Sequence, residues 1–498
     1  MGQEVELKLE LDGKDAQALA GDDLLRDVDS RSERLVSVYY DTRGGKLRKN
    51  GYSLRVRSTP DGYVQTLKSL ESSSGLFFRG EWESPVDSIE PHAETLASTP
   101  AGEVGAKKLV PVVRSTVERT SWRVTDEGNE LEIALDDGDV RAEGRDQPLC
   151  ELEIELKRGK AEAAFHAARE LATRLPLRLG VMSKAERGFA LVDDSLGKVA
   201  KAQPLPLNAE MSVAEGFALI VQSCIRHFRL NEPLVLGDQN PNALHQARVA
   251  MRRLRSALSL FRPAVGDGEY DRLREELRWF TAQLGDARNL DVYLSGELSK
   301  PERKRLLGQR KQAYADVVET LNSKRLQLLL IDLMAWVSIG GWRSGKRAAR
   351  PLPEFAGSRI SRLWLKISSH GDLGAMDDEE RHQLRIEIKK LRYALDFMQA
   401  LYARAAARQK QFTRAIEALQ ESLGRLNDIV TARSLASDDG AEPEPNRHGD
   451  EVTRCIRHAV KCFNRLKLVG PYWIRIPRSA ATRSKTAVRV SSRSGLTE

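Results

Sequence analysis

The sequence predicts an α+β protein of at least two domains, with a strand-rich front and an all-helical back. The 498-residue chain is longer than one hydrophobic core ordinarily organises. Apolar and charged residues alternate along much of residues 1–192, which is the period of half-buried strands. From about residue 209 the apolar residues recur at helical spacing, and one helical pattern occurs twice.

The distribution of charge divides the chain at nearly the same place. Residues 1–200 contain 29 Lys and Arg against 37 Asp and Glu, a net charge of −8. The other residues contain 50 of the 79 basic and 34 of the 71 acidic side chains, a net charge of +16. We therefore expect the back half to attract a polyanion, while the carboxylates of the front half need another explanation.

Composition also limits the compartment and the chemistry. The four cysteines have no metal-ligand spacing, so neither a disulfide framework nor a zinc site is favoured. No apolar run reaches the ~20 residues that a membrane span needs, and the N-terminus lacks a basic-then-apolar leader. We expect a cytoplasmic protein without membrane contact, and the absence of a GxxxxGK[ST] motif excludes a P-loop.

Short alternating runs with turn residues between them favour a barrel or a wrapped sheet in the front half. A linker rich in Pro and Gly is expected at 193–208, followed by a helical domain over 209–475. The Ser, Thr and Arg composition of 476–498 predicts a disordered basic tail.

Two of the alternating runs place several carboxylates on one strand face. Glu4, Glu6 and Lys8 are two residues apart, as are Glu151 and Glu153. Carboxylates at this spacing lie ~6.6 Å apart, and two such strands side by side would repel unless a cation lay between them. Mg²⁺ and Mn²⁺ favour oxygen ligands of this kind. For any one strand alone, a solvated charged face is the competing interpretation.

A second set of residues in the front half is cationic. Arg55 and Arg57 share one strand face, and Lys68, Arg119 and Lys184 lie on or beside strand-like runs. A barrel with carboxylates on some inward faces and cations on others could hold metal ions and phosphate groups together.

At this point the front half resembles the CYTH domains, also called triphosphate tunnel metalloenzymes. The resemblance rests on motifs in the order of the family: Glu4-x-Glu6-x-Lys8, Tyr39-Tyr40-Asp41-Thr42, Leu54-Arg55-Val56-Arg57, Thr66-Leu67-Lys68, Leu135-Asp136-Asp137-Gly138, Glu151-x-Glu153-x-Glu155-x-Lys157 and Ser183-Lys184-x-x-Arg187-Gly188. It implies an eight-stranded antiparallel tunnel barrel with flanking helices over residues 1–192, which binds a linear triphosphate.

The resemblance also implies roles for individual residues. The metal ligands would be Glu4, Glu6, Asp136, Glu151 and Glu153, with Asp137 as an alternative to its neighbour. The phosphate-binding cations would be Lys8, Arg55, Arg57, Lys68, Arg119 and Lys184. Glu4, Glu6, Lys8 and Glu153 would form the catalytic centre, and the further candidates for the lining are Glu155, Arg79, Arg114 and Arg187.

The back half contains a repeated basic helix face. His245, Arg248, Arg252 and Arg255 are three, four and three residues apart, which places them on one side of a helix. The same steps separate His382, Arg385, Lys389 and Arg392. A matched acidic residue follows each copy, Asp286 and Asp428. A single basic face could simply be solvated, but its repetition with histidine in register indicates an anion ligand.

This half resembles the CHAD domain, an all-helical domain named for its conserved histidines that often follows a CYTH domain. The match covers about 209–475 and includes both histidine repeats and the Gly470-Pro-Tyr-Trp473 end. The resemblance implies that polyphosphate binds along a basic groove of a helical bundle with an internal repeat.

Together these observations predict an inorganic triphosphatase that uses Mg²⁺ or Mn²⁺ to hydrolyse tripolyphosphate to pyrophosphate and phosphate. The helical domain would bind polyphosphate or recruit the protein to polyphosphate granules. Three alternatives stay open: a non-catalytic polyphosphate-binding protein, a tunnel enzyme acting on thiamine triphosphate or a nucleotide, and nucleic-acid binding, which the lack of stacking motifs disfavours. The oligomeric state and the choice of metal also stay open.

Overall fold

The computed structural model describes residues 2–70, 78–105, 108–438 and 445–474. The predicted tail at 476–498 lies outside these residues. The chain forms two compact units, Met1–Leu205 with Glu210–Leu352, and Pro206–Ala209 with Pro353–Glu498. The two units are groups of residues in contact with one another, and they do not test the domain boundaries predicted at 192 and 209.

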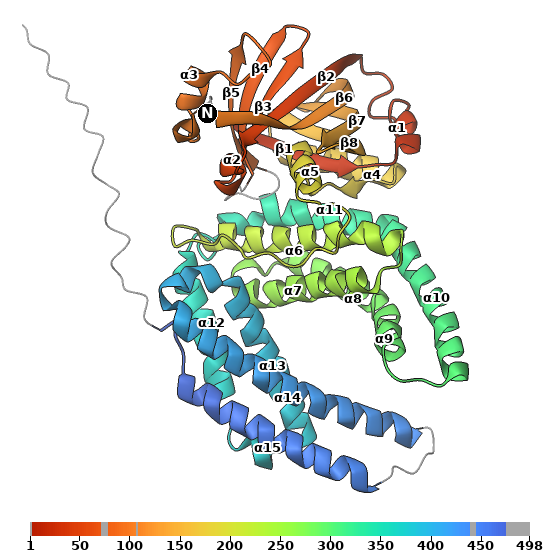
Figure 1. Cartoon of the computed structure of the whole chain (residues 1–498), viewed down its shortest axis with the longest axis vertical. Coiled ribbons are helices and arrows are strands. Elements are labelled where there is room, and N and C mark those ends of the chain that lie inside the picture. Colours follow the sequence, from red (N-terminus) through yellow and green to blue (C-terminus); the bar gives the residue numbers. More distant parts are fainter. Residues whose placement is uncertain (1, 71–77, 106–107, 439–444, 475–498) are drawn as a thin grey trace, which may run out of the picture. The chain divides into compact units, whose positions relative to one another are not determined.

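The first unit begins with a nine-stranded antiparallel sheet (Figure 1). The strand order is β5-β4-β3-β2-β6-β7-β8-β1-β9, and β1 also pairs with β5 between Gly2–Val5 and Phe78–Glu81. The strands are β1 (Gly2–Glu10), β2 (Ser30–Thr42), β3 (Tyr52–Thr59), β4 (Gly62–Ser69), β5 (Phe78–Val86), β6 (Leu109–Asp126), β7 (Asn129–Ala142), β8 (Arg145–Arg158) and β9 (Arg178–Leu179).

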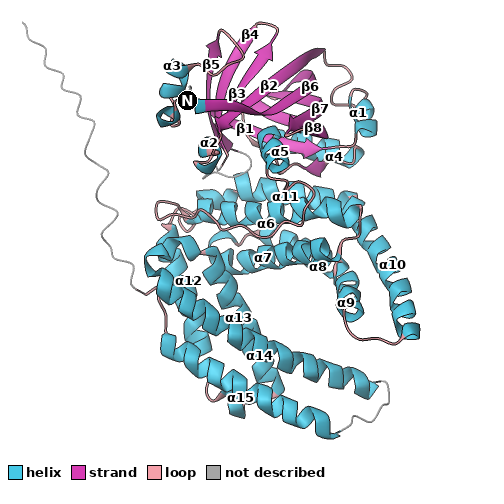
Figure 2. Cartoon of the chain, in the orientation of Figure 1, coloured by secondary structure: helices cyan, strands magenta, loops and turns pink. Residues whose placement is uncertain are grey.

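The predicted fold class is confirmed in its outline, an antiparallel sheet with flanking helices followed by a helical region (Figure 2). The predicted number of eight strands is wrong, because the two-residue β9 pairs with the end of β1 and makes a ninth. β5, at one end of the strand order, pairs with β1, which is next to the other end, over four residue pairs, so a fully closed tunnel stays a prediction.

Alternation along the strands separates two faces of the sheet. The face that carries Lys8, Arg119 and Glu153 is termed the inner face. Leu9 and Ile154 point to the opposite, outer face and are fully buried where α4 (Glu162–Arg174) covers it. Another part of the outer face packs Leu54, Val56 and Leu67 against α2 (Lys46–Lys49) and α3 (Ala93–Ala97).

Helix α5 (Lys184–Val192) fills one end of the inner face. Its residues Ala185 and Phe189 pack with Tyr39, Val113 and Val117 of β2 and β6. A capping box of Ser183 and Glu186 begins the helix, because each side chain satisfies a backbone N–H of the first turn. Lys184 is the first residue of this helix and lies five residues after the end of β9.

The rest of the first unit is helical and continues into the second. The first unit holds α6 (Val213–Leu236), α7 (Pro241–Val265), α8 (Gly268–Gln283), α9 (Gly285–Leu294), α10 (Lys300–Asn322) and α11 (Lys324–Ile339). In the second unit lie most of α12 (Leu352–Ser368) and all of α13 (Asp378–Phe397), α14 (Ala406–Asp438) and α15 (Pro445–Val469). Within the described ranges, no helix has the length and hydropathy that a membrane crossing requires.

Several of these helices begin with the capping signals that their sequence predicts. Ser212 with Glu215 and Asp377 with Glu380 form capping boxes at α6 and α13. Asn240 caps α7, and Pro241 occupies its first position, where a missing N–H costs nothing. The repeated basic pattern therefore lies on two regular helices, α7 and α13.

The close packing of α5 on the sheet gives the first prediction. A Cβ atom at Gly188 would lie 2.1 Å from Val113 Cγ1, so Gly188→Ala should lower the free energy of unfolding by about 1–3 kcal/mol. The control is Gly308→Ala in α10, where a Cβ meets nothing within 4 Å; it should stabilise by about 0.5–1 kcal/mol through helix propensity. Urea denaturation followed by tryptophan fluorescence measures both, and equal effects of the two substitutions would refute the packing argument.

Candidate functional site: a charged network on the inner face

Four neighbouring strands bring the charged side chains of the inner face together. Lys8 of β1 lies opposite Glu153 of β8, and Glu151 of β8 lies opposite Asp136 of β7. Asp136 in turn lies opposite Arg119 of β6. Residues that face one another across antiparallel strands have their side chains on the same face, so this register alone builds the cluster.

Three cations in this cluster each contact more than one carboxylate. Lys8 Nζ lies 2.7 Å from Glu6 Oε1 and 3.8 Å from Glu151 Oε1, and it also pairs with Glu153. Lys184 Nζ lies 2.6 Å from Asp136 Oδ2 and 3.0 Å from Glu153 Oε1, and it also pairs with Glu151.

Arg119 is the third cation, and it makes a bidentate contact with Asp136. Its Nε and Nη2 atoms donate to the two carboxylate oxygens of Asp136 at 2.7 Å each, and Nη2 also donates to Glu153. The seven side chains form one connected set, termed the charged network: Glu6, Lys8, Arg119, Asp136, Glu151, Glu153 and Lys184.

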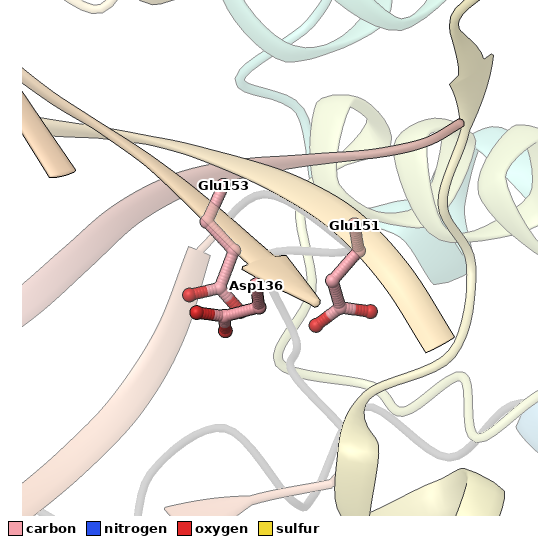
Figure 3. Close-up of side chains that lie close together, drawn as sticks. All are labelled: Asp136, Glu151 and Glu153. Carbon is pink, nitrogen blue, oxygen red and sulfur yellow. The ribbon is translucent and has the colours of Figure 1, made fainter. Parts of the chain in front are cut away.

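Three of the carboxylates are close enough to share a metal ion. One oxygen each from Asp136, Glu151 and Glu153 lies within 4.8 Å of the others, and Figure 3 shows the three side chains converging from two adjacent strands. Asp136 is 0% exposed, whereas the neighbouring Asp137 is exposed. Buried anionic oxygens suit a hard cation such as Mg²⁺ or Mn²⁺, so the donor set fits the predicted metal.

The other two predicted metal ligands stand apart from this trio. Glu6 pairs with Lys8 and is not among the three clustered carboxylates. The backbone of Glu4 pairs with Arg79 of β5, but the side chains of both residues lie outside the described part of the structure.

Mutual attraction within the charged network shifts the pKa values of several members in favour of the charged forms. Burial alone would raise the pKa of Glu153, but Lys184, Lys8 and Arg119 hold that pKa well below its ordinary value. The pKa of Asp136 is lowered in the same way by Lys184 and Arg119, against the effect of burial. Burial would lower the pKa values of Lys8 and Lys184, yet the carboxylates raise both.

The predicted phosphate-binding residues of β3 and β4 lie on the same sheet beside this network. Arg55 Nη2 lies 3.8 Å from Glu83 Oε1, and Lys68 Nζ lies 3.0 Å from Glu81 Oε1. Arg57 donates from Nε to Ser37 Oγ at 3.2 Å. Burial, followed by repulsion from Arg55 and Arg119, lowers the pKa of Arg57 to about 10. A surplus of positive potential around this arginine would be relieved by an anion.

The additional lining candidates divide between the two faces. Arg114 is exposed and lies five residues from Arg119 on β6, which places it on the opposite face, so its assignment to the lining is wrong. Glu155 pairs with Lys157 at 2.6 Å. Arg187 pairs with Glu10, an inner-face residue that the sequence interpretation missed although it continues the alternation of β1.

The first basic helix face lies on α7 and is extended by two neighbouring helices. His245 and Arg248 are half-buried, while Arg252 and Arg255 are exposed. Arg248 donates from Nη1 to the carbonyl oxygen of Leu284 at 2.6 Å. Burial lowers the pKa of His245, and the nearby Arg288, Arg252 and Arg248 lower it further.

Three cations of this face were missed in the sequence. Arg288 of α9 lies near His245 and Arg248, and its repulsion lowers their pKa values after the effect of burial. Arg278 and Arg274 of α8 act on Arg255 in the same way. The four-residue spacing of Arg274 and Arg278 was a usable signal, but only the packing of α7 with α8 shows which face they share.

The second basic face lies on α13 in the other unit. His382, Arg385, Lys389 and Arg392 are all half-buried there. In the part of the chain that the structure describes, the Nε atoms of Arg385 and Arg392 are buried and lack a hydrogen-bond partner. Such donors are costly to leave unpaired, which is consistent with a missing acceptor. The side chain of Asp428 lies outside the described residues.

With this geometry in place, comparison with known proteins identifies both halves. Residues 2–189 match the CYTH domain, and residues 219–437 match the CHAD domain. The chain joins a CYTH domain to a CHAD domain. This confirms the two resemblances that the sequence motifs carried.

Individual relatives cover different parts of this CYTH–CHAD chain. An inorganic triphosphatase of Haemophilus influenzae is 31% identical over 162 residues, which are 32% of this chain and 46% of that protein. The match thus spans less than half the length of that relative. Two uncharacterized proteins of Mycobacterium tuberculosis are each 26% identical over 443 residues, 82% of this chain and 83% of theirs.

Solved structures resemble each half separately. The CHAD domain of the plant Ricinus communis covers 55% of this chain and 96% of its own, with 25% identity and a TM-score of 0.43. A putative adenylyl cyclase of Hippeastrum, described as having a dominant triphosphatase activity, covers 38% of this chain and 95% of its own, with 19% identity and a TM-score of 0.30. Both TM-scores are below 0.5, so neither likeness supports a conclusion of its own.

The charged network gives the second prediction, on stability. Asp136→Asn should lower the free energy of unfolding at pH 7 by about 3 kcal/mol, since it removes one partner of a buried ionic cluster. The matched control is Asp139→Asn on the same strand, whose partner Arg141 is mostly exposed; its cost should stay below about 1 kcal/mol.

The pH dependence follows from the lowered pKa of Asp136. Its stabilising effect is complete above the pKa of the unfolded chain and is lost as the pH falls through the folded pKa. The difference between the wild type and D136N in urea denaturation should therefore shrink below about pH 4. A difference that stays constant down to pH 3 would contradict this assignment.

Proposed function

We propose that the CYTH domain is a metal-dependent inorganic triphosphatase that hydrolyses tripolyphosphate to pyrophosphate and phosphate. The observation that carries the proposal is the charged network, in which three clustered carboxylates alternate with Lys8, Arg119 and Lys184 on one buried face. The name of the Haemophilus influenzae relative, an inorganic triphosphatase, supports it.

The residues of the network have the chemistry that phosphoryl transfer needs. Asp136, Glu151 and Glu153 would hold Mg²⁺ or Mn²⁺, which when bound polarises phosphoryl oxygens and lowers the pKa of a bound water. Lys8, Arg119 and Lys184, now paired with carboxylates, would exchange these partners for phosphate oxygens. Because this transition state needs mainly positioning and charge neutralisation, such an exchange would supply most of the catalysis.

An inorganic substrate is proposed in preference to a nucleotide or thiamine triphosphate, because the sequence offers no aromatic-rich pocket for a base. Arg55, Arg57 and Lys68 would extend the cationic lining along a linear phosphate chain. Glu4 and Glu6 stay proposed members of the catalytic centre through their match to the family motif.

For the CHAD domain we propose polyphosphate binding. The residues would be His245, Arg248, Arg252 and Arg255 on α7, and His382, Arg385, Lys389 and Arg392 on α13. The buried, unpartnered Nε atoms of Arg385 and Arg392 and the clustered cations around His245 support this assignment. Polyphosphate held there would be kept near the hydrolytic site, in the cytoplasm or at polyphosphate granules. The competing proposal is a polyphosphate-binding protein without turnover.

An assay of phosphate release tests the hydrolase. The purified full-length chain should release phosphate from tripolyphosphate with Mg²⁺ or Mn²⁺, and Glu153→Gln should lower kcat by about 100-fold or more, the scale for losing one group that stabilises charge. Glu118→Gln on the exposed face of β6 is the matched control and should leave the rate unchanged. Metal-dependent release that E153Q does not affect, or no release at all, would favour the binding protein. Nucleoside and thiamine triphosphates in the same panel test the alternative substrates.

Binding of long-chain polyphosphate tests the role of the CHAD domain. In the E153Q background, the double substitution of Arg252 and Arg288 by alanine should weaken binding by about tenfold or more, because charge-assisted contacts are lost. The salt dependence should also decrease by about one unit of slope per arginine. Arg303→Ala, an exposed arginine on α10, is the control. Tighter binding of RNA than of polyphosphate at equal salt would contradict the proposal.

A further inference from the structure

Residues 178–187 comprise β9, its connection to α5 and the first turn of α5, and are termed the Lys184 segment. The segment contains Lys184 and contacts Lys8, the other lysine of the charged network. The backbone N–H of Gly180 donates to the carbonyl oxygen of Lys8 at 2.8 Å, and Lys184 itself reaches Asp136, Glu151 and Glu153. A Cβ at Gly180 would lie 3.0 Å from Lys8 Cβ, so the segment packs tightly against β1 at this point. The position of this short segment therefore sets where Lys184 stands.

One face of α6, the first helix of the helical half, holds this segment. Arg229 is 3% exposed; it donates from Nε to the carbonyl oxygen of Leu179 at 2.8 Å and from Nη2 to Glu10 Oε2 at 2.9 Å. Three residues earlier, Arg226 donates from Nη1 to the carbonyl oxygen of Val181. The two arginines lie on the same side of the helix and hydrogen-bond to the backbone on either side of Gly180.

Arg226 also contacts the group that begins α5. Its Nη2 atom lies 3.0 Å from Glu186 Oε1, while Glu186 Oε2 accepts from the backbone N–H and the hydroxyl of Ser183 at 2.8 Å each. The carboxylate of Glu186 thus takes part both in the cap of α5 and in an ion pair with α6. Lys184 is the first residue after that cap, so a movement of α6 would displace the backbone of Lys184 as well.

Glu10 forms a second link between the same elements. It ends β1, two residues after Lys8 on the same face, and accepts from Arg229 of α6 and Arg187 of α5. Charge-assisted contacts of this kind are stronger than neutral ones, particularly where they are buried. Helix α6 therefore contacts the Lys184 segment, including the first turn of α5, and β1, the strand that carries Lys8.

We propose that Arg226 and Arg229 of α6 are positioning residues for the triphosphatase site, acting through the Lys184 segment to hold Lys184 in place. The inference rests on the proposed hydrolysis and extends it, since it makes part of the CHAD half necessary for efficient chemistry in the CYTH half. A simple tether between the halves would not need these contacts, because Arg169 of α4 already pairs with Asp332 of α11 at 2.9 Å.

A double-mutant cycle on the full-length chain tests the proposal. Arg226→Gln is preferred over a change at Arg229, because Arg226 is about one-third exposed and its loss leaves fewer buried charges unpaired. R226Q should lower kcat/KM for tripolyphosphate by about tenfold or more, as expected when a reacting group is displaced. In the Lys184→Gln background it should have almost no further effect, because the residue through which it acts is gone.

Two matched variants separate positioning from loss of stability. Arg169→Gln removes another arginine contact of the interface, one that does not involve the Lys184 segment, and should leave kcat/KM within about twofold of the wild type, a change typical of surface pairs. Arg226→Lys keeps a donor for Val181 or Glu186 and should recover part of the lost rate. If K184Q does not unfold cooperatively, Lys184→Arg takes its place in the cycle. Fully additive effects of R226Q and K184Q, or equal losses in R226Q and R169Q, would overturn the inference.

Binding measurements distinguish failure of this inference from failure of the proposed hydrolysis. If the wild type releases no phosphate, the hydrolase proposal fails, and calorimetric binding of tripolyphosphate with Mg²⁺ replaces kcat/KM in the same cycle. Positioning of Lys184 would then be supported if R226Q, but not R169Q, weakens binding of tripolyphosphate and if this effect of R226Q disappears in the K184Q background. Equal binding by wild type and R226Q, or no binding by the wild type, would overturn it.

Discussion

The need to neutralise buried charge determines how the sheet of this protein is built. Four carboxylates and three cations of the charged network lie on one largely buried face, where any one of them alone would be strongly unfavourable. Each is tolerated because the register of β6, β7, β8 and β1 places opposite charges side by side. The pairs satisfy one another without a ligand, yet every one of them consists of groups that a metal ion or a phosphate could take instead. A network of exchangeable partners thus neutralises the buried charges of the folded sheet and is the basis of the proposed chemistry.

Much of this arrangement could be predicted from the sequence, because strand alternation is a local property. The period of two at Glu6 and Lys8, and at Glu151 and Glu153, is enough to assign these side chains to one face of their strands. Which strands are neighbours depends on contacts distant in sequence, so the pairing of Lys8 with Glu153 became visible only in the structure. The start of α5 at Lys184 was not recognised although Ser183 and Glu186 have the spacing of a capping box, and β9 was missed because two residues show no period.

The helical half shows the same division between local and distant information. The repeat of His245 with Arg248 and of His382 with Arg385 is visible in the sequence because each copy lies on one helix. The contribution of Arg288 is not visible there, since it depends on how α9 packs beside α7. The contacts of Arg226 and Arg229 were equally hidden. In the sequence they are two arginines on an apolar helix, and only the structure shows that they contact the carbonyl groups of Val181 and Leu179.

The two halves present different balances of charge to the phosphate ligands proposed for them. The charged network itself has four carboxylates against three cations, so a metal ion would offset the added negative charge if a phosphate chain bound there. On α7 the nearby groups are mostly cationic, and repulsion among them lowers the pKa values of His245, Arg248 and Arg255 after the effect of burial. An anion relieves that repulsion directly and needs no metal. The same polyanion would therefore bind the helical half through charge alone and react only where carboxylates and a metal supply the remaining balance.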